Sequence, residues 1–321
     1  MIRVGGSHFD LGANQLSYAA GSSSLTPDGF RILGESDRQR LQQLTGAFPS
    51  LLGWLNPDSL IISAYPASLG LQGMAPFVDT YLHPPTFIRA MRLAALDMRP
   101  VVMAAQPLLG AEMILQTIAA GLEMPKAVLW AVGGYYLPHS LESFIAEELA
   151  ECGCDLEVLH CYGVAEIGHT CFAAMNRFES GEPRYQLIAD DVFTSIERGS
   201  GRLQLRREDR VLTTEDLAEV VDGDWKIRNG SERMCPEVFR DLESWSPSAW
   251  RRRTGYLHAD ARRTVYQLRE SVDPNASTQE IRYHRFWEQF GGSVQCKPQW
   301  HRDPIKRFSF ANHQEKQSAS A

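Results

Sequence analysis

The chain has 321 residues, with 32 Lys and Arg against 39 Asp and Glu, so its formal net charge is −7. Hydrophobic residues make up 44% and charged residues 22%, a globular composition that excludes a disordered, collagen-like or coiled-coil chain and allows about two domains. The acidic balance argues against a dedicated nucleic-acid protein, and no apolar run reaches the roughly 18 residues of a membrane span.

The location of the protein is expected to be cytoplasmic. The start, MIRVGGSHFD, has no signal-peptide layout. The six cysteines do not make a disulfide scaffold, and no second Cys/His pair follows Cys152 and Cys154 at zinc-site spacing. We therefore expect reduced and mostly buried thiols.

The first 235 residues alternate between short apolar runs and amphipathic stretches. After a short strand at 16–20, continuous apolar runs predict buried strands at 60–66, 100–105, 127–134 and 156–163. Helical spacing of apolar residues predicts helices at 86–97 and 110–122, and a third helix capped by Ser140. Strands alternating with helices indicate an α/β fold whose mostly parallel sheet is covered on both faces.

The later part of the chain changes character twice. Short, alternating segments over 180–227 predict a small antiparallel β region. From about residue 236 the sequence becomes rich in Arg and Trp, with a helix capped by Ser277 and closed by Gly291. We therefore expect a core domain over 1–235 and a small α+β domain over 236–321, with a frayed polar tail.

Two segments offer backbone groups to a ligand. The loop AAGSSSLTPDG (19–29) can wrap phosphate oxygens with N–H groups and hydroxyls, although it is also compatible with a plain flexible loop. GGYYLP (133–138) follows a buried strand, and ligands of open parallel sheets bind beyond the carboxyl ends of the strands. The alternative for GGYYLP is a tight strand-to-helix turn.

Two further segments combine aromatic and acidic groups. In HCYGVAEIGH (160–169), Tyr162 offers a stacking face, Gly163 allows close backbone approach and Glu166 can hold a divalent cation. The flanking His160 and His169 are interpreted as satisfied structural histidines. In VLTTEDLAEVVDGDW (211–225), Asp216 can accept hydrogen bonds from both hydroxyls of a ribose, or it is one more loop aspartate.

The order of these four segments resembles that of the adenylate-forming superfamily, which includes acyl-CoA synthetases and nonribosomal adenylation domains. The four motifs appear in the same order as in the superfamily: the phosphate loop, GG-x-x-L-P, Y-G-x-A-E and T-x-D-L. RNGSERMCPEVF (228–239) looks like the segment that opens the family's small C-terminal domain. PQWHRDPIKRFSF (298–310) resembles the element that carries the catalytic lysine, which places that lysine at Lys306.

The resemblance implies that ATP and Mg²⁺ activate a small carboxylic acid as an acyl-adenylate. The implied nucleotide contacts are Ser22, Ser23, Ser24 and Thr26 for the β- and γ-phosphates, Gly133, Gly134 and Tyr135 for the acyl and adenine pocket, Tyr162 and Gly163 beside adenine, Asp216 for ribose and Arg228 for a further ribose or phosphate contact. Glu166 would coordinate Mg²⁺, and Lys306 would bridge the carboxylate and the α-phosphate. The acyl group would then pass to CoA, to the phosphopantetheine thiol of a carrier protein, or to an amine.

The chain departs from the family pattern at several positions. Asp28 stands where the phosphate loop usually has lysine, Ala165 replaces a threonine, Glu215 replaces the glycine of T-G-D-L, and Ile305 replaces the glycine before the lysine. The phosphate loop also starts near residue 20, whereas members usually carry a long segment ahead of it. We therefore expect a homodimer or a partner subunit to cover the surface that this segment covers in other members.

Two hypotheses follow from these features. The chain is a compact adenylate-forming ligase, favoured by Tyr162, Glu166, Asp216 and Lys306 together, or it is a non-catalytic relative that binds or scaffolds a biosynthetic partner, favoured by Asp28 and Glu215. The Arg-rich stretch 250–271 would grip CoA phosphates or the acidic helix of a carrier protein, with nucleic acid the weakest candidate and a solvated face the alternative.

Overall fold

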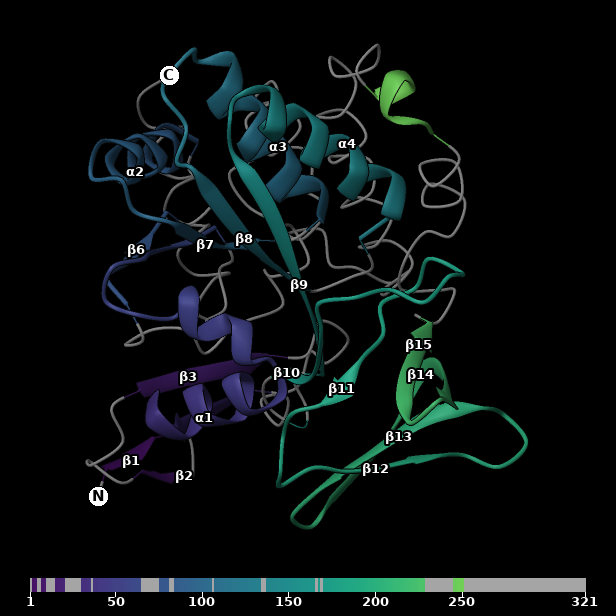
Figure 1. The fold of residues 1–321 in the computed structure, drawn as a ribbon. Coiled ribbons are helices and arrows are strands. Elements are labelled where there is room, and N and C mark those ends of the chain that lie inside the picture. Colours follow the sequence, from purple (N-terminus) through teal and green to yellow (C-terminus); the bar gives the residue numbers. More distant parts are fainter. Residues whose placement is uncertain are drawn as a thin grey trace, which may run out of the picture.

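The structure is a computed structural model. The residues that it describes are 2–4, 7–9, 15–20, 30–35, 37–64, 75–80, 84–105, 107–133, 137–164, 167, 170–228 and 245–250. They form a mixed α/β structure with one seven-stranded sheet and a separate four-stranded antiparallel sheet (Figure 1). Within these ranges, no helix combines the length and the apolar character needed to cross a membrane.

The seven-stranded sheet confirms the predicted fold class. Its strand order is β11–β10–β9–β8–β7–β5–β6, in which β6, β5, β7, β8 and β9 are parallel and β10 and β11 are antiparallel. The strands are β5 (Leu60–Ser63), β6 (Phe77–Asp79), β7 (Val101–Ala105), β8 (Ala127–Val132), β9 (Asp155–Gly163), β10 (Thr170–Ala174) and β11 (Gln186–Leu187). The four predicted apolar strands are β5, β7, β8 and β9, whereas β6, β10 and β11 were not predicted.

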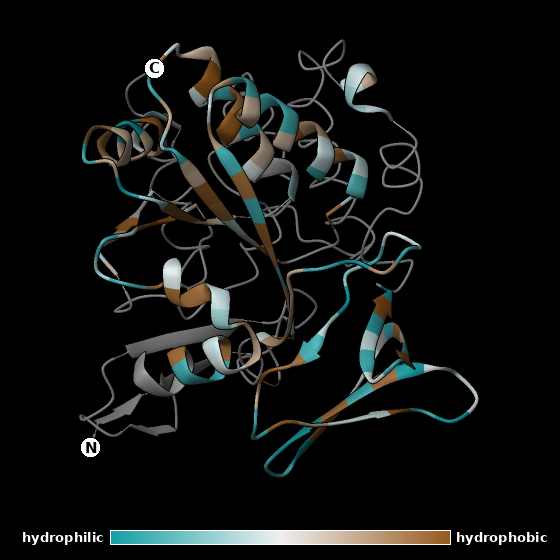
Figure 2. Ribbon diagram, in the orientation of Figure 1, coloured by the Kyte–Doolittle hydropathy of each residue, from teal (hydrophilic) through white to brown (hydrophobic). Residues whose placement is uncertain are grey.

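Helices cover both faces of this sheet, because its central strands are apolar on both sides. Ile62, Met103 and Trp130 point to one face, where α2, α3 and α4 pack. Ile61, Val102 and Leu129 point to the other face and meet α1 and the 3₁₀ helix η2. The helices are α1 (Asp37–Ala47), η2 (Pro49–Gly53), α2 (Pro84–Leu96), α3 (Pro107–Ala119) and α4 (His139–Glu151). Figure 2 shows apolar residues along the central strands and on the helices beside them.

The starts of two helices differ from the predictions. α3 begins at Pro107, three residues earlier than predicted, because proline is tolerated in the first helical turn. Within α3, Gly110 lies so close to Trp130 that an added Cβ would be 2.6 Å from the indole Cζ2. The prediction that Ser140 caps α4 is wrong, since the N-cap is Pro138, with no side-chain cap hydrogen bond, and Ser140 lies inside the first turn.

The second sheet lies within the predicted antiparallel region. Its strands are β12 (Phe193–Ile196), β13 (Arg202–Arg207), β14 (Arg210–Val221) and β15 (Asp224–Arg228). The turn between β14 and β15 consists of Asp222 and Gly223, both with positive φ, as a two-residue hairpin of type I′ requires. Leu203, Leu205 and Ile227 from this sheet share a core with Phe172 of β10.

Two hairpins precede α1. β1 (Ile2–Val4) pairs with β2 (Ser7–Phe9), and β3 (Gln15–Ala20) pairs with β4 (Phe30–Glu35). The predicted strand at 16–20 is therefore confirmed as part of β3. The pairing of Ala20 with Phe30 brings together the two ends of the hydroxyl-rich loop, whose residues 21–29 lie outside the described part.

A short segment near residue 250 packs onto α4. Trp250 is fully buried, its ring stacks on Phe144 at 5.9 Å, and its Nε1 donates to Oγ of Ser140 at 3.3 Å. The Ser140 hydroxyl is therefore a partner of a residue 110 positions away in the chain. The domain boundary predicted after residue 235 lies outside the described residues, as does the helix predicted between Ser277 and Gly291.

Trp250→Ala should lower the free energy of unfolding by about 3–5 kcal/mol, because it removes a fully buried ring from the core. Urea denaturation at neutral pH measures the change. The control is Leu52→Ala, at a side chain that is 58% exposed, which should change stability by less than about 0.5 kcal/mol. Equal effects of the two substitutions would contradict the packing of residue 250 on α4.

Candidate functional site

The candidate site lies at the edge where the parallel strands end. Gly133 follows β8, and Gly163 is the last residue of the neighbouring β9. The two strands are in register with Val132 beside His160. A Cβ at Gly133 would lie 3.1 Å from the carbonyl oxygen of Cys161, so glycine allows the chain to leave β8 close against β9.

Tyr162 and Asp216 meet at this edge. The Tyr162 hydroxyl donates to Oδ2 of Asp216 at 2.6 Å, and the two residues are only 8% and 2% exposed. The Tyr162 ring makes edge-to-face contacts with Phe172 and Tyr185, with centroids 5.9 and 6.1 Å away. Two residues 54 positions apart, both predicted to contact the nucleotide, are thus in direct contact.

A bulge in the second sheet aims Asp216 toward Tyr162. Arg202 pairs with Leu217 and Gln204 with Thr213, so one residue of β13 faces three residues of β14. Oγ1 of Thr214 accepts the N–H of Asp216 at 3.1 Å and donates to the carbonyl of Leu203 at 3.0 Å. Bulges commonly re-aim a side chain in this way, and here the turned side chain is a buried carboxylate.

Arg228 is not brought together with Tyr162 and Asp216. It lies opposite Leu217 in the β14–β15 ladder, and Leu217 is exposed. Because successive residues of a strand point to opposite faces, Arg228 points away from the buried Asp216. Its guanidinium bonds Oε1 of Glu182 at 3.1 Å and lies 3.8 Å from Glu219.

The other predicted contacts fall on residues that the structure does not describe. They are Ser22, Ser23, Ser24, Thr26, Gly134, Tyr135, Glu166 and Lys306. In the described ranges, no group of three His, Cys, Asp or Glu residues is placed to hold a metal ion. His169 also lies outside these ranges.

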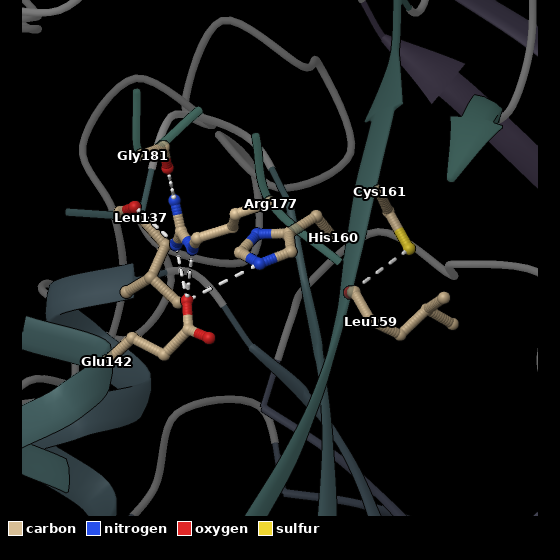
Figure 3. Close-up of polar contacts among 7 residues, drawn as sticks. All are labelled: Leu137, Glu142, Leu159, His160, Cys161, Arg177 and Gly181. Carbon is tan, nitrogen blue, oxygen red and sulfur yellow. Dashed lines mark hydrogen bonds and ion pairs between the residues drawn. The ribbon is translucent and has the colours of Figure 1, made fainter. Parts of the chain in front are cut away.

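A second polar cluster joins His160, Glu142 and Arg177 (Figure 3). It lies next to the end of β8, because His160 pairs with Val132. Nε2 of His160 lies 3.4 Å from Oε2 of Glu142, and the imidazole is buried. Arg177 donates to the same oxygen through Nε at 2.8 Å and through Nη2. The interpretation of His160 as a satisfied structural histidine is therefore confirmed, whereas the sequence analysis missed Glu142 and Arg177.

The protonation states in this cluster follow from burial and charge. Burial alone would raise the pKa of Glu142, but the hydrogen bonds and charges of His160 and Arg177 outweigh it and bring that pKa to about 2. Burial lowers the pKa of His160, and the nearby Arg177 charge acts in the same direction. Near neutral pH the cluster thus holds a carboxylate, a guanidinium and a neutral imidazole.

The four described cysteines are unbridged and differ in burial. Cys154 and Cys171 are buried, Cys161 is half-buried and Cys152 is exposed. Burial raises the pKa of Cys154 to about 12, and the nearby Asp155 acts in the same direction.

No protein-family model and no curated protein matches the chain. Solved structures that match include the anthranilate CoA ligase AuaEII in complex with anthranoyl-AMP, at 13% identity and a TM-score of 0.41, over 68% of this chain and 47% of that one. A second is the amide bond synthetase McbA from Marinactinospora thermotolerans, at 11% identity and a TM-score of 0.43, over 68% of this chain and 49% of that one. A third is the luciferase-like enzyme from the mealworm Zophobas morio, at 12% identity and a TM-score of 0.41, over 67% of this chain and 57% of that one. The chain spans about half the length of these proteins and resembles part of their structures.

Glu142→Gln should lower the free energy of unfolding at pH 7 by about 3 kcal/mol, because the buried Arg177 loses its counter-charge. The pKa of Glu142 in the folded state lies below its ordinary value of 4.5, so the stabilisation is complete above pH 4.5 and is lost as the pH falls toward 2. Urea denaturation between pH 3 and 7 should therefore give two stability curves that converge on acidification.

The matched control is Glu123→Gln, at an exposed carboxylate after α3, which should shift stability by less than about 0.5 kcal/mol at every pH. A constant difference between wild type and Glu142→Gln across this pH range would show that Glu142 does not stabilise the fold through its charge.

Proposed function

We propose that the protein activates a small carboxylic acid with ATP, forming an acyl-adenylate and releasing pyrophosphate. The observation that carries the proposal is the contact between Tyr162 and Asp216 beside Gly133, at the carboxyl edge of a parallel sheet. Ligands of open α/β sheets bind at this edge. An aromatic ring, a carboxylate and a closely approaching backbone are groups suited to an adenine, a ribose and an acyl chain.

In this proposal each residue acts on a different part of the substrates. Asp216 accepts hydrogen bonds from the ribose hydroxyls, and Tyr162 lies beside adenine. The hydroxyl-rich loop with Ser22, Ser23, Ser24 and Thr26 joins β3 to β4 and holds the β- and γ-phosphates. Lys306 neutralises the charge shared by the carboxylate and the α-phosphate, which lowers the barrier because that charge develops in the transition state.

The bond that forms joins a carboxylate oxygen of the acid to the α-phosphorus, and the bond that breaks releases pyrophosphate. Mg²⁺ is commonly bound through one or two carboxylates together with substrate phosphates, and Glu166 is the carboxylate that we assign to it. When bound, the ion would supply positive charge next to the phosphates.

The acceptor of the acyl group belongs to the same proposal. CoA, a phosphopantetheine thiol of a carrier protein or an amine would receive the acyl group, with release of AMP. A second copy of the chain or a partner subunit would complete the wall of the acid pocket.

A second candidate function is a non-catalytic binding or scaffolding role. The specific observation that favours it is that Tyr162 and Asp216 are buried and bond one another, so each polar group is satisfied without a nucleotide. Asp28 and Glu215 favour it as well, because they add negative charge where the phosphates would lie.

ATP–pyrophosphate exchange with a panel of aryl and short aliphatic acids should give a signal for at least one acid. In Asp216→Asn the KM for ATP should rise by about tenfold to a hundredfold, because the ribose loses charge-assisted hydrogen bonds. The control is Asp190→Asn, at an exposed carboxylate that accepts a bond from Gln43, with kinetics expected to match wild type. Absence of exchange with every acid, together with no thermal shift on adding ATP, would contradict the proposed adenylation.

Lys306→Ala should reduce the exchange rate by about a hundredfold or more, because one positive group at the reacting phosphate is removed. Lys297→Ala removes a lysine nine positions earlier in the sequence and should leave the rate unchanged. Exchange by the Lys306 variant at the wild-type rate would refute the role assigned to that lysine.

A further inference from the structure

Thr214 lies in the bulge of β14, and its hydroxyl connects this strand to β13. The side chain is buried. Its Oγ1 donates to the carbonyl of Leu203 at 3.0 Å and accepts the N–H of Asp216 at 3.1 Å. The carbonyl of Asp216 lies farther away, at 3.4 Å, and a hydroxyl has only one proton, which the shorter contact to Leu203 uses. One hydroxyl therefore bonds a carbonyl of β13 and an N–H of β14.

These bonds matter because regular strand pairing is interrupted at this point. Arg202 and Gln204 pair with β14 on either side of the bulge and are two positions apart, whereas their partners in β14 are four positions apart. The ladder by itself therefore does not fix the directions of the side chains inside the bulge. The bond from the Thr214 hydroxyl to the N–H of Asp216 does so instead, as in the turns that threonine forms with its own backbone two residues later.

We propose that Thr214 is a positioning residue for ribose binding, because its hydroxyl holds the carboxylate of Asp216 in the direction that meets Tyr162. The contact between Asp216 and Tyr162 is short, at 2.6 Å, and a hydrogen bond weakens steeply when its donor and acceptor are misaligned. The inference rests on the proposed function in one respect, namely that Asp216 contacts the ribose of ATP. Thr214 then influences nucleotide binding without touching the nucleotide.

Three variants separate the hydroxyl of Thr214 from the shape of its side chain. Thr214→Val keeps the shape and removes the hydroxyl, whereas Thr214→Ser keeps the hydroxyl and removes a methyl group. The matched control is Thr213→Val, at the preceding residue, whose hydroxyl accepts a bond from Gln204 at 3.2 Å. The control therefore also removes a bonded hydroxyl from β14, but not the one that bonds Asp216.

The first measurement needs no nucleotide and is a double-mutant cycle, in which urea denaturation gives the equilibrium constant of unfolding. Tyr162→Phe should raise this constant at least about tenfold in the wild-type background, because Asp216 loses a hydrogen bond. In the Thr214→Val background the rise should be less than about threefold, because the carboxylate no longer points at residue 162. In the Thr214→Ser and Thr213→Val backgrounds the rise should be as large as in wild type.

Two results of the cycle would overturn the inference. A full effect of Tyr162→Phe in the Thr214→Val background would show that Thr214 contributes only its own bonds. A lost effect in the Thr214→Ser background would show that the hydroxyl is not what positions Asp216. If Thr214→Val does not fold, Thr214→Ala replaces it in the same cycle, with the same expected and contradicting results.

The second measurement tests the connection to the ribose. In pyrophosphate exchange, wild type should have a KM for 2′-deoxy-ATP about tenfold above the KM for ATP, because the deoxy nucleotide leaves a carboxylate bond unmade. In Thr214→Val the two KM values should lie within about twofold of each other, whereas Thr213→Val should keep the wild-type ratio.

Equal KM values for the two nucleotides in wild type, or an unchanged ratio in Thr214→Val, would contradict a role in ribose binding. If wild type activates no acid, the proposed function fails by itself. The unfolding cycle alone then decides whether Thr214 positions Asp216.

Discussion

The parallel pairing of β8 with β9 is the constraint on which the rest of the structure depends. Parallel strands need long crossover connections, and both faces of their sheet must be covered. α4 provides the crossover between these two strands, and α1 covers the opposite face. Because both strands run to the same edge, Gly133 leaves β8 beside Cys161, two residues before the end of β9 at Gly163.

Two polar clusters use this edge, and both involve the same face of β9. His160 and Tyr162 are two positions apart, so their side chains lie on one face of the strand. His160 turns to Glu142 of α4, whereas Tyr162 turns to Asp216 of the second sheet. β9 therefore links the helical layer to the antiparallel sheet through two buried hydrogen-bonded contacts. Each contact costs the desolvation of a carboxylate, which a well-placed partner must offset.

The sequence was sufficient to predict the parts of the fold that depend on local pattern. The strands at 60–63, 101–105 and 127–132 are almost entirely apolar and buried, so burial is visible in the sequence itself, whereas in the strand at 155–163 burial begins only at Val158. β10 and β11 were missed because they are short and owe their pairing to the edge of a sheet that other strands build. The cap assigned to Ser140 failed because α4 begins at His139, which places Ser140 inside the first turn, where its hydroxyl accepts a bond from Trp250, 110 positions away.

The same distinction applies to the candidate site. The order of the motifs predicted that Tyr162 and Asp216 contact one ligand. Their hydrogen bond to each other depends on a bulge in β14, which no local sequence pattern predicts. Arg177 and Glu142 are 35 residues apart and belong to no motif, so only the folded chain reveals their contact. Arg228 is the last residue of β15, whose outward face was not predicted, and the direction of its side chain depends on pairing with Leu217.

The burial of Trp250 on α4 also joins distant parts of the chain. Its indole bonds Ser140 in the first turn of α4, only a few residues after Gly133. Residue 250 and the start of the helix that follows β8 are therefore held together across 110 positions of the chain.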